Sequence, residues 1–278
     1  MYSIMPTILR ARRLCGNALI AASCLASATA LAQPQSVHLE DLTWPELTQR
    51  IAAGAATAIV PTGGTEQNGP HMALGKHNFV VREAAGRIAR ELGLALVAPV
   101  LTVVPEGPLE RPSGNLQFAG TLALSEDSFE RVLRDIALSL ARSGFKLICF
   151  IGDHGQSQAA QTRVAERLSG EWRSSGIRVV NVSAYYSPDG EERELIRSGL
   201  AKEALGDHGG IADTAQLMAV KPEALRREFF VLNNWKGKGP SGASGRPELA
   251  SAELGERLLR QRVLAAVRQI QALALRQQ

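Results

Sequence analysis

Short apolar runs with the character of buried strands alternate along this chain with longer segments of helical periodicity. The strand-like runs cover residues 55–61, 95–100, 146–152 and 179–182, and the helical segments cover residues 80–92, 125–143, 159–174 and 250–278. Strands that alternate with helices of ten or more residues pair in parallel and place the helices on both faces of the sheet. We therefore predict an α/β fold, a three-layer α/β/α sandwich with a mainly parallel central sheet, and one domain over residues 33–278.

The first 32 residues have the organisation of a secretory signal peptide. Three arginines between residues 10 and 13 precede an uncharged run rich in Ala and Leu, which ends in Ala-Leu-Ala before Gln33. This run is short and polar for a membrane span of about 20 residues, which disfavours an anchor. Arg12-Arg13 would also suit a twin-arginine signal, and Cys24 a lipoprotein cysteine, but the flanking residues support neither. We expect cleavage near Ala32 and a periplasmic or secreted mature protein.

The charge and the cysteines of the mature chain follow from this leader. Its removal takes away three basic residues and no acidic ones, so the 31 basic and 27 acidic residues of the whole chain become nearly balanced. No nucleic-acid partner is implied, and no stable membrane insertion is expected after leader removal. Of the three cysteines only Cys149 remains, inside the third apolar run, so no internal disulfide can form. We predict that its thiol is a buried small side chain rather than a nucleophile.

Histidines and acids gather where the predicted strands end. Ligands of an open parallel sheet bind beyond the carboxyl ends of its strands. The first strand is followed by Gly-Gly-Thr-Glu-Gln-Asn-Gly-Pro-His at residues 63–71 and then by His77, and the third strand by Gly-Asp-His-Gly at residues 152–155. A further glycine-rich segment holds His208 and Asp213 at a predicted helix start. Imidazole with carboxylate suits zinc, manganese or iron, and neighbouring glycines permit close backbone approach.

Each of these residues also has a purely structural explanation. A single loop histidine is usually exposed or hydrogen-bonded within the fold, and Asp213 could simply favour a helix N-terminus. Their joint placement at predicted strand ends and in glycine-rich turns favours a metal site. The sequence has no Gly-x-Ser-x-Gly elbow, no Walker phosphate loop and no Gly-x-Gly-x-x-Gly fingerprint after the first strand, so neither a serine hydrolase nor a nucleotide enzyme is favoured.

These segments resemble the creatininase, or creatinine amidohydrolase, family, which also contains a formamide deformylase and a peptidase of mycofactocin maturation. Residues 61–78 resemble its Glu-x-His-Gly-Pro-His-Leu-Pro-x-Gly-x-Asp signature, residues 152–157 its Asn-Gly-His-Gly-Gly-Asn turn, residues 208–215 its His-Ala-Gly-x-x-Glu-Thr-Ser block, and residues 242–258 a C-terminal segment. The blocks stand in family order. The resemblance implies a creatininase-like sandwich, a metal-dependent amidohydrolase and a homo-oligomer, often a hexamer.

The resemblance also implies roles for particular residues. In the family, two divalent metals share a bridging Asp and bind further Glu or His ligands. Glu66 falls on a metal-binding Glu, His154 on a metal-binding His, and Asp213 on a Glu that often completes the site. His208 falls on a His thought to assist proton transfer.

Two positions depart from the family pattern. Asn68 stands where the family has a metal-binding His, and His77 stands where it has the bridging Asp. An imidazole nitrogen cannot bridge two cations as a carboxylate does, and an amide is a poor ligand for transition metals. We therefore predict one metal, held by Glu66, His77 and His154, with Asp213 as a fourth ligand or as the residue that holds a water.

Three protein ligands and an open position are typical of a catalytic zinc, with manganese or iron also compatible. We predict hydrolysis of a C–N bond in a small cyclic or linear amide by metal-activated water, with esters and lactones within the same chemistry. Catalytic roles are assigned to His208, which protonates the leaving nitrogen, and to Asp213. Substrate-contacting or supporting roles are assigned to Asn68, His71 and Gly155, the last as an oxyanion donor.

Two other functions fit the same residues. One is a non-catalytic exported binding protein in which the altered ligands record a lost activity, and the other is an isomerase or lyase on the same scaffold. Metal analysis separates the enzyme from the binder. Family analogy alone does not identify the substrate.

Overall fold

A computed structural model describes residues 36–234, 237 and 240–275, and the structural statements below concern these residues. The predicted leader, residues 1–32, lies outside them. Residues 236–247, a stretch rich in Gly, Ser and Pro, lie partly outside them, and Pro247 begins a short 3-10 turn, Pro247–Leu249.

Four parallel strands form the central sheet. They are β1 (Thr57–Thr62), β2 (Ala95–Val97), β3 (Leu147–Gly152) and β4 (Arg178–Asn181), in the order β2-β1-β3-β4. The long central pair runs in register from Thr57 opposite Leu147 to Thr62 opposite Gly152. The four predicted strands and their parallel pairing are confirmed, with ends that shift by at most three residues.

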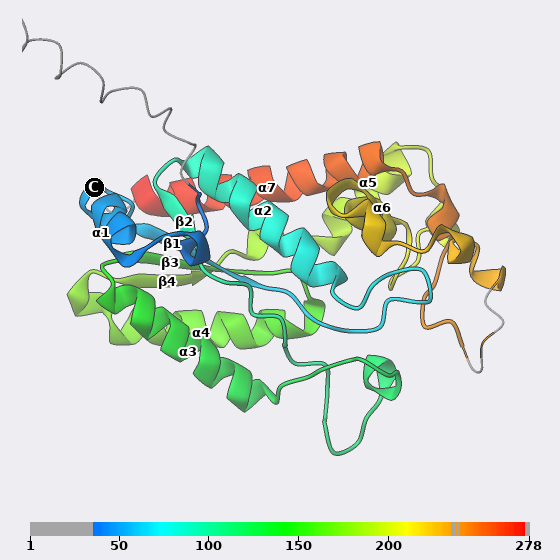
Figure 1. The fold of residues 1–278 in the computed structure, drawn as a ribbon, viewed down its shortest axis with the longest axis horizontal. Helices are drawn as coiled ribbons and strands as arrows, with labels where there is room; N and C mark the ends of the chain where they lie inside the picture. The colour runs from blue at the N-terminus through cyan, green and yellow to red at the C-terminus, as the bar shows by residue number, and fades with distance from the viewer. Residues whose placement is uncertain (1–35, 235–236, 238–239, 276–278) are drawn as a thin grey trace, which may run out of the picture. The chain divides into compact units, whose positions relative to one another are not determined.

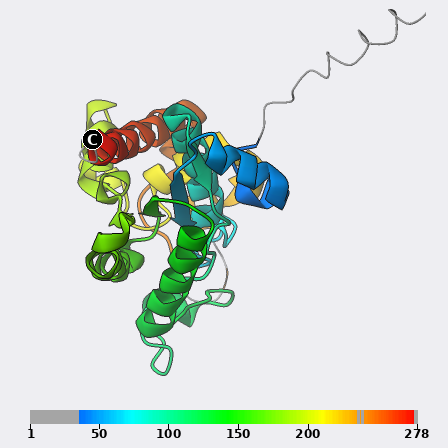
Figure 2. The same cartoon turned by 90° about the vertical axis from the view of Figure 1, so that its left-hand side faces the viewer.

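Helices cover both faces of this sheet, as predicted. The first face packs against α2 (Lys76–Leu92) and α7 (Ala252–Leu275), and the second against α1 (Trp44–Ala52), α3 (Glu126–Arg142) and α4 (Gln158–Glu171). Figure 1 shows α2 and α7 above the strands and α3 and α4 below them. In Figure 2 the red α7 and the green α3 lie on opposite sides of the strands.

The alternation of side chains along the strands divides the core between these faces. In β3, Cys149 and Ile151 belong to the cluster with α2 and α7, whereas Ile148 and Phe150 belong to the cluster with α3 and α4. Cys149 is fully buried, as predicted. Burial raises the pKa of its thiol to about 12, so it is not a thiolate at neutral pH.

Two helices were not predicted, and each contributes little to the buried core. α1 has no fully buried residue and begins with a capping box in which the backbone N–H of Thr43 donates to Glu46. α5 (Pro188–Arg197) buries only Leu195.

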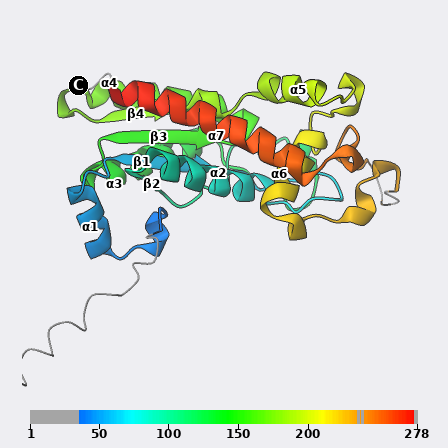
Figure 3. The ribbon, with the colours of Figure 1, turned by 90° about the horizontal axis from the view of Figure 1, so that it is seen from above.

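The remaining helix, α6 (Ile211–Val220), crosses α7 closely. A Cβ on Gly255 of α7 would lie 1.8 Å from the carbonyl oxygen of Ala215, so only glycine permits this approach. Figure 3 shows α6 beside the N-terminal part of α7, beyond the end of the sheet. No described helix combines the length and the apolar character that crossing a membrane requires.

Candidate metal and catalytic site

The site lies where β1 and β3 end and α2 begins. The turn after β1 is fixed to α2, because the Asn78 side-chain oxygen accepts from the backbone N–H of Gly64 at 3.0 Å. A Cβ at Gly63 would lie 2.0 Å from that oxygen, which explains why the turn needs glycine there. This close approach brings Glu66, from the loop after β1, to His77 in the first turn of α2.

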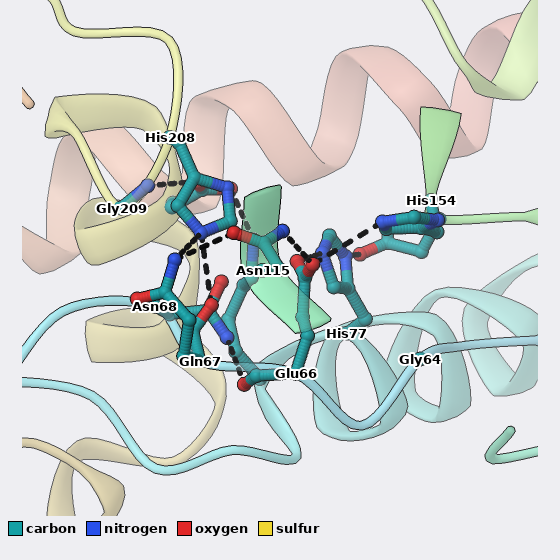
Figure 4. A network of polar contacts seen from close by, with 12 residues as sticks. Gly64, Glu66, Gln67, Asn68, His77, Asn115, His154, His208 and Gly209 are labelled. Carbon is teal, nitrogen blue, oxygen red and sulfur yellow. Dashed lines mark hydrogen bonds and ion pairs between the residues drawn. The ribbon is translucent and has the colours of Figure 1, made fainter. Parts of the chain in front are cut away.

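Three predicted metal ligands meet at this point. Donor atoms of Glu66, His77 and His154 all lie within 4.8 Å of one another. Glu66 Oε1 is 2.8 Å from His77 Nε2, and Glu66 Oε2 is 3.3 Å from His154 Nε2. All three side chains are buried, and Figure 4 shows them facing one another. One carboxylate and two imidazoles form a donor set that suits zinc and similar divalent cations.

A buried acid fixes the orientation of His77. Nδ1 of His77 donates to Asp153 Oδ2 at 2.8 Å, which leaves Nε2 directed at Glu66. The other oxygen of Asp153 accepts from Tyr185 at 2.8 Å and from Arg262 at 2.5 Å. Burial alone would raise the pKa of Asp153, but Arg262 and His77 hold it below its usual range. Carboxylates in this position hold a histidine ligand in the tautomer that metal binding needs.

His154 lies between two carboxylates, of which sequence reasoning identified only one. Its Nε2 is 3.3 Å from Glu66 Oε2 and 3.2 Å from Glu106 Oε2. Glu106 comes from the long connection between β2 and α3, where no periodicity or glycine-histidine pattern marks it. Asn115, from the same connection, donates its amide to Glu66 and was also missed.

The buried carboxylates of this cluster favour a positive charge close to them. Although burial acts in the opposite direction, the pairing with Glu106 and Glu66 raises the pKa of His154 to about 9. Despite burial, hydrogen bonds from His154 and His77 hold the pKa of Glu66 below its usual range. Burial raises the pKa of Glu106. A bound cation would neutralise the carboxylates that a proton on His154 otherwise compensates, so the residues fit a metal.

Asp213 and His208 lie apart from these three donors. Oδ1 of Asp213 is 2.8 Å from Lys76 Nζ, and Oδ2 accepts from the backbone N–H of Gly209 at 2.9 Å. The structure therefore gives Asp213 a lysine partner and does not bring it into the three-residue group. His208 Nε2 is 2.8 Å from the carbonyl oxygen of Gln67 and 3.0 Å from its side-chain nitrogen. Both residues line the same cavity as the three donors.

The structure separates the three residues to which supporting roles were assigned. Gly155 lines the cavity, and a Cβ there would lie 2.8 Å from the Tyr186 hydroxyl. Asn68 is fully buried, donates to the carbonyl oxygen of Glu66 at 2.9 Å, and is absent from the cavity lining. His71 is also fully buried and outside the lining, with Nε2 3.1 Å from the Thr214 hydroxyl. Asn68 and His71 thus contact protein groups in this structure.

The cavity beside the donors has a volume of about 320 Å³ and is open to solvent. Its wall carries two basic residues, Lys76 and Arg262, and a larger number of acidic ones: Glu66, Asp153, Asp189, Glu191, Glu192, Asp207 and Asp213. The volume is at the lower end of the range for small-molecule sites, which is about 300–1,000 Å³.

Comparison with known proteins identifies the family to which this chain is related. The family model described as creatinine amidohydrolase matches residues 40–270. The chain belongs to the creatininase family.

Similar proteins in the creatininase family are named for different substrates. The chain is 28% identical over 195 residues to a creatinine amidohydrolase of Pseudomonas putida, covering 69% of this chain and 74% of that protein. It is 24% identical over 225 residues to a mycofactocin precursor peptide peptidase of Mycolicibacterium smegmatis, covering 74% and 80%. Two creatininase structures, a variant of zinc–zinc type and a manganese form, match at 23% identity, 86% of this chain and 98% of theirs, with TM-scores of 0.69 and 0.68.

If Asp153 fixes the histidine ligand, Asp153→Asn should weaken zinc binding by about 10–100-fold, as loss of such partners does in other metal sites. The amide can present its N–H₂ group to His77 Nδ1 and so disturb the tautomer. Competition with a chromophoric chelator measures the affinity. Glu191→Gln is the matched control, because Glu191 also bonds Arg262 but does not contact His77. Equal zinc affinity in Asp153→Asn and wild type would contradict this role.

The buried His71 should make the protein sensitive to acid. Burial lowers its pKa to about 4, so between the unfolded value near 6.5 and pH 4 only the unfolded chain takes up the proton. The stability it contributes is present above pH 6.5 and lost as pH falls to 4, by about 3 kcal/mol. Urea unfolding of wild type and His71→Gln at several pH values measures this difference. Parallel pH profiles would show that His71 does not contribute.

Proposed function

We propose that this creatininase-family hydrolase cleaves a C–N bond of a small amide with one divalent cation, zinc or manganese, held by Glu66, His77 and His154. The convergence of these three buried donors from separate segments supports this proposal best. His77 occupies the position of the family's bridging Asp, and one imidazole nitrogen serves one cation. The proposed centre therefore holds a single tightly bound metal.

When bound, the cation would supply a water of lowered pKa and polarise the substrate carbonyl. The protein's own groups then bind and orient the amide. Gly155 lines the cavity, and its backbone N–H would donate to the carbonyl oxygen. His208 donates to the Gln67 carbonyl through Nε2, and this proton is the one that it would transfer to the leaving nitrogen.

The charged wall of the cavity indicates which amides can bind. The ion pair between Lys76 and Asp213 lies at the cavity, as does the pair between Arg262 and Asp153. Substrates that carry both donors and acceptors fit such a wall, and the small volume favours compact cyclic or linear amides over a folded polypeptide.

Reconstitution tests the proposal. The purified chain is stripped with a chelator, reloaded with zinc or manganese, and analysed for metal, and the metal-loaded protein is assayed with creatinine, other small cyclic amides and short peptides. We expect about one retained ion and hydrolysis that the chelator abolishes and the metal restores. Retention of much less than one equivalent, with no hydrolysis, would instead favour the non-catalytic binding protein.

We also propose that the mature enzyme is exported and begins near Gln33, on the basis of the arginines and the Ala-Leu-Ala sequence that precede it. N-terminal sequencing of protein from the periplasm tests this, and a retained leader on cytoplasmic protein would refute it. Assembly into a homo-oligomer is proposed from family membership alone, and light scattering measures it.

A further inference from the structure

Glu106 is a buried carboxylate for which the three-ligand site provides no role. The residue is 2% exposed, and neither of its oxygens has a hydrogen-bond partner among the described residues. It faces His154 Nε2 at 3.2 Å but accepts no hydrogen bond, whereas buried carboxylates in proteins are usually hydrogen-bonded or bound to metals. The inference that follows rests on the proposed metal centre and concerns its ligand set.

The surroundings of Glu106 point toward the metal position. Its Oε2 is 3.2 Å from His154 Nε2, and that same nitrogen is 3.3 Å from Glu66 Oε2. Two donors bound to one zinc at about 2.0 Å are separated by about 3.3 Å when the geometry is tetrahedral. One oxygen of Glu66 and one of Glu106 therefore lie at the distance from His154 Nε2 that is expected for two ligands of the same cation.

Asp213, which the sequence predicted as a possible fourth ligand, is bound to other protein groups. Asp213 uses one oxygen for Lys76 and the other for the backbone of Gly209. Glu106 lies outside the three-residue group but, with no hydrogen bond to hold its carboxylate, can rotate toward it. We propose that Glu106 is the fourth protein ligand of the cation, so that two carboxylates and two imidazoles form a centre with no net charge.

This ligand set has a consequence for the metal. Four protein ligands leave room for water only where the cation accepts a fifth ligand, which zinc does in some catalytic sites and which manganese, usually octahedral, does readily. The proposal therefore favours manganese, or a five-coordinate zinc, over a zinc restricted to four ligands.

Replacement of Glu106 by glutamine tests the proposal through metal affinity rather than activity. We expect Glu106→Gln to weaken manganese and zinc binding by more than about 100-fold, since loss of supporting residues alone costs about 10–100-fold. Glu110→Gln is the matched control, because Glu110 is an exposed carboxylate on the same connection. Its affinity should equal that of wild type. A smaller loss in Glu106→Gln would overturn the proposal.

A crystal structure of the metal-loaded wild-type protein decides the question even if the variant does not fold. We expect a Glu106 oxygen at about 2.2 Å from the cation, and a distance above about 3 Å would overturn the proposal. The experiments distinguish the metal centre from the role of Glu106. If wild type and Glu106→Gln bind the metal equally well, only the role of Glu106 is refuted. If wild-type protein binds no metal, the proposed centre and the role of Glu106 are both refuted.

Discussion

Glu66→Gln should abolish tight metal binding and lower amide hydrolysis by at least about 1,000-fold, the scale expected when a metal-activated nucleophile is lost. Glu66 is 1% exposed, and its two carboxylate oxygens lie one against His77 and the other against His154. The amide keeps the size of the side chain but removes its negative charge and puts a donor beside the imidazoles. Elemental analysis after metal loading and a hydrolysis assay measure the two effects.

Asn115, which donates a hydrogen bond to the Glu66 carboxylate, provides a control for this substitution. Asn115→Ala removes the amide that donates to Glu66 and leaves all carboxylate and imidazole donors in place. We expect this variant to retain about one equivalent of metal. If Glu66→Gln also retained a full equivalent, Glu66 would not be a ligand and the proposed centre would have to be built from other residues.

The layered fold was predictable because its strands are continuous apolar runs. β3 is buried along its whole length, so Leu147 to Gly152 stands out in the sequence, and β1 behaves almost the same way. The acidic α5 gives no such signal, since Leu195 is its single buried residue. Helices that lie largely exposed carry too few apolar positions for periodicity to reveal them.

The convergence of the three proposed metal donors was predictable for a topological reason. Parallel strands end at one edge of the sheet, so loops after β1 and β3 must approach each other there, and His77 follows on the helix that the first loop enters. Asp153 was visible beside His154, but its hydrogen bond to His77 depends on side-chain directions that only the structure supplies.

Glu106 and Asn115 could not be predicted in the same way. Both come from the connection between β2 and α3, which is tied to the rest of the fold by isolated bridges such as Thr65 to Leu122 and by side-chain hydrogen bonds rather than by a strand of the sheet. Sequence spacing says little about where such a connection passes. The pairing of Asp213 with Lys76 was equally hidden, because it requires a lysine that is buried at the start of α2.

The combined substitution Asn68→His and His77→Asp should raise the retained metal from about one to about two ions per chain. It restores the histidine and the bridging carboxylate that the family pattern has at these positions, and a two-metal site requires a shared ligand. Asn68 is fully buried beside Glu66, with a side-chain oxygen that has no partner, so the substitution changes a position close to the first ligand. Titration with zinc or manganese followed by elemental analysis measures the stoichiometry.

The single substitution His77→Asp separates this effect from simple damage. It replaces the imidazole beside Asp153 with a carboxylate that can bind a cation, but it does not supply the second metal's histidine. The double variant should therefore retain about two ions, whereas wild type and the single variant should each retain about one. If wild-type protein already holds two tightly bound ions, His77 does not limit the centre to one, and a different side chain must bridge them. Glu106, which already lies beside His154, would then be the first residue to test in that role.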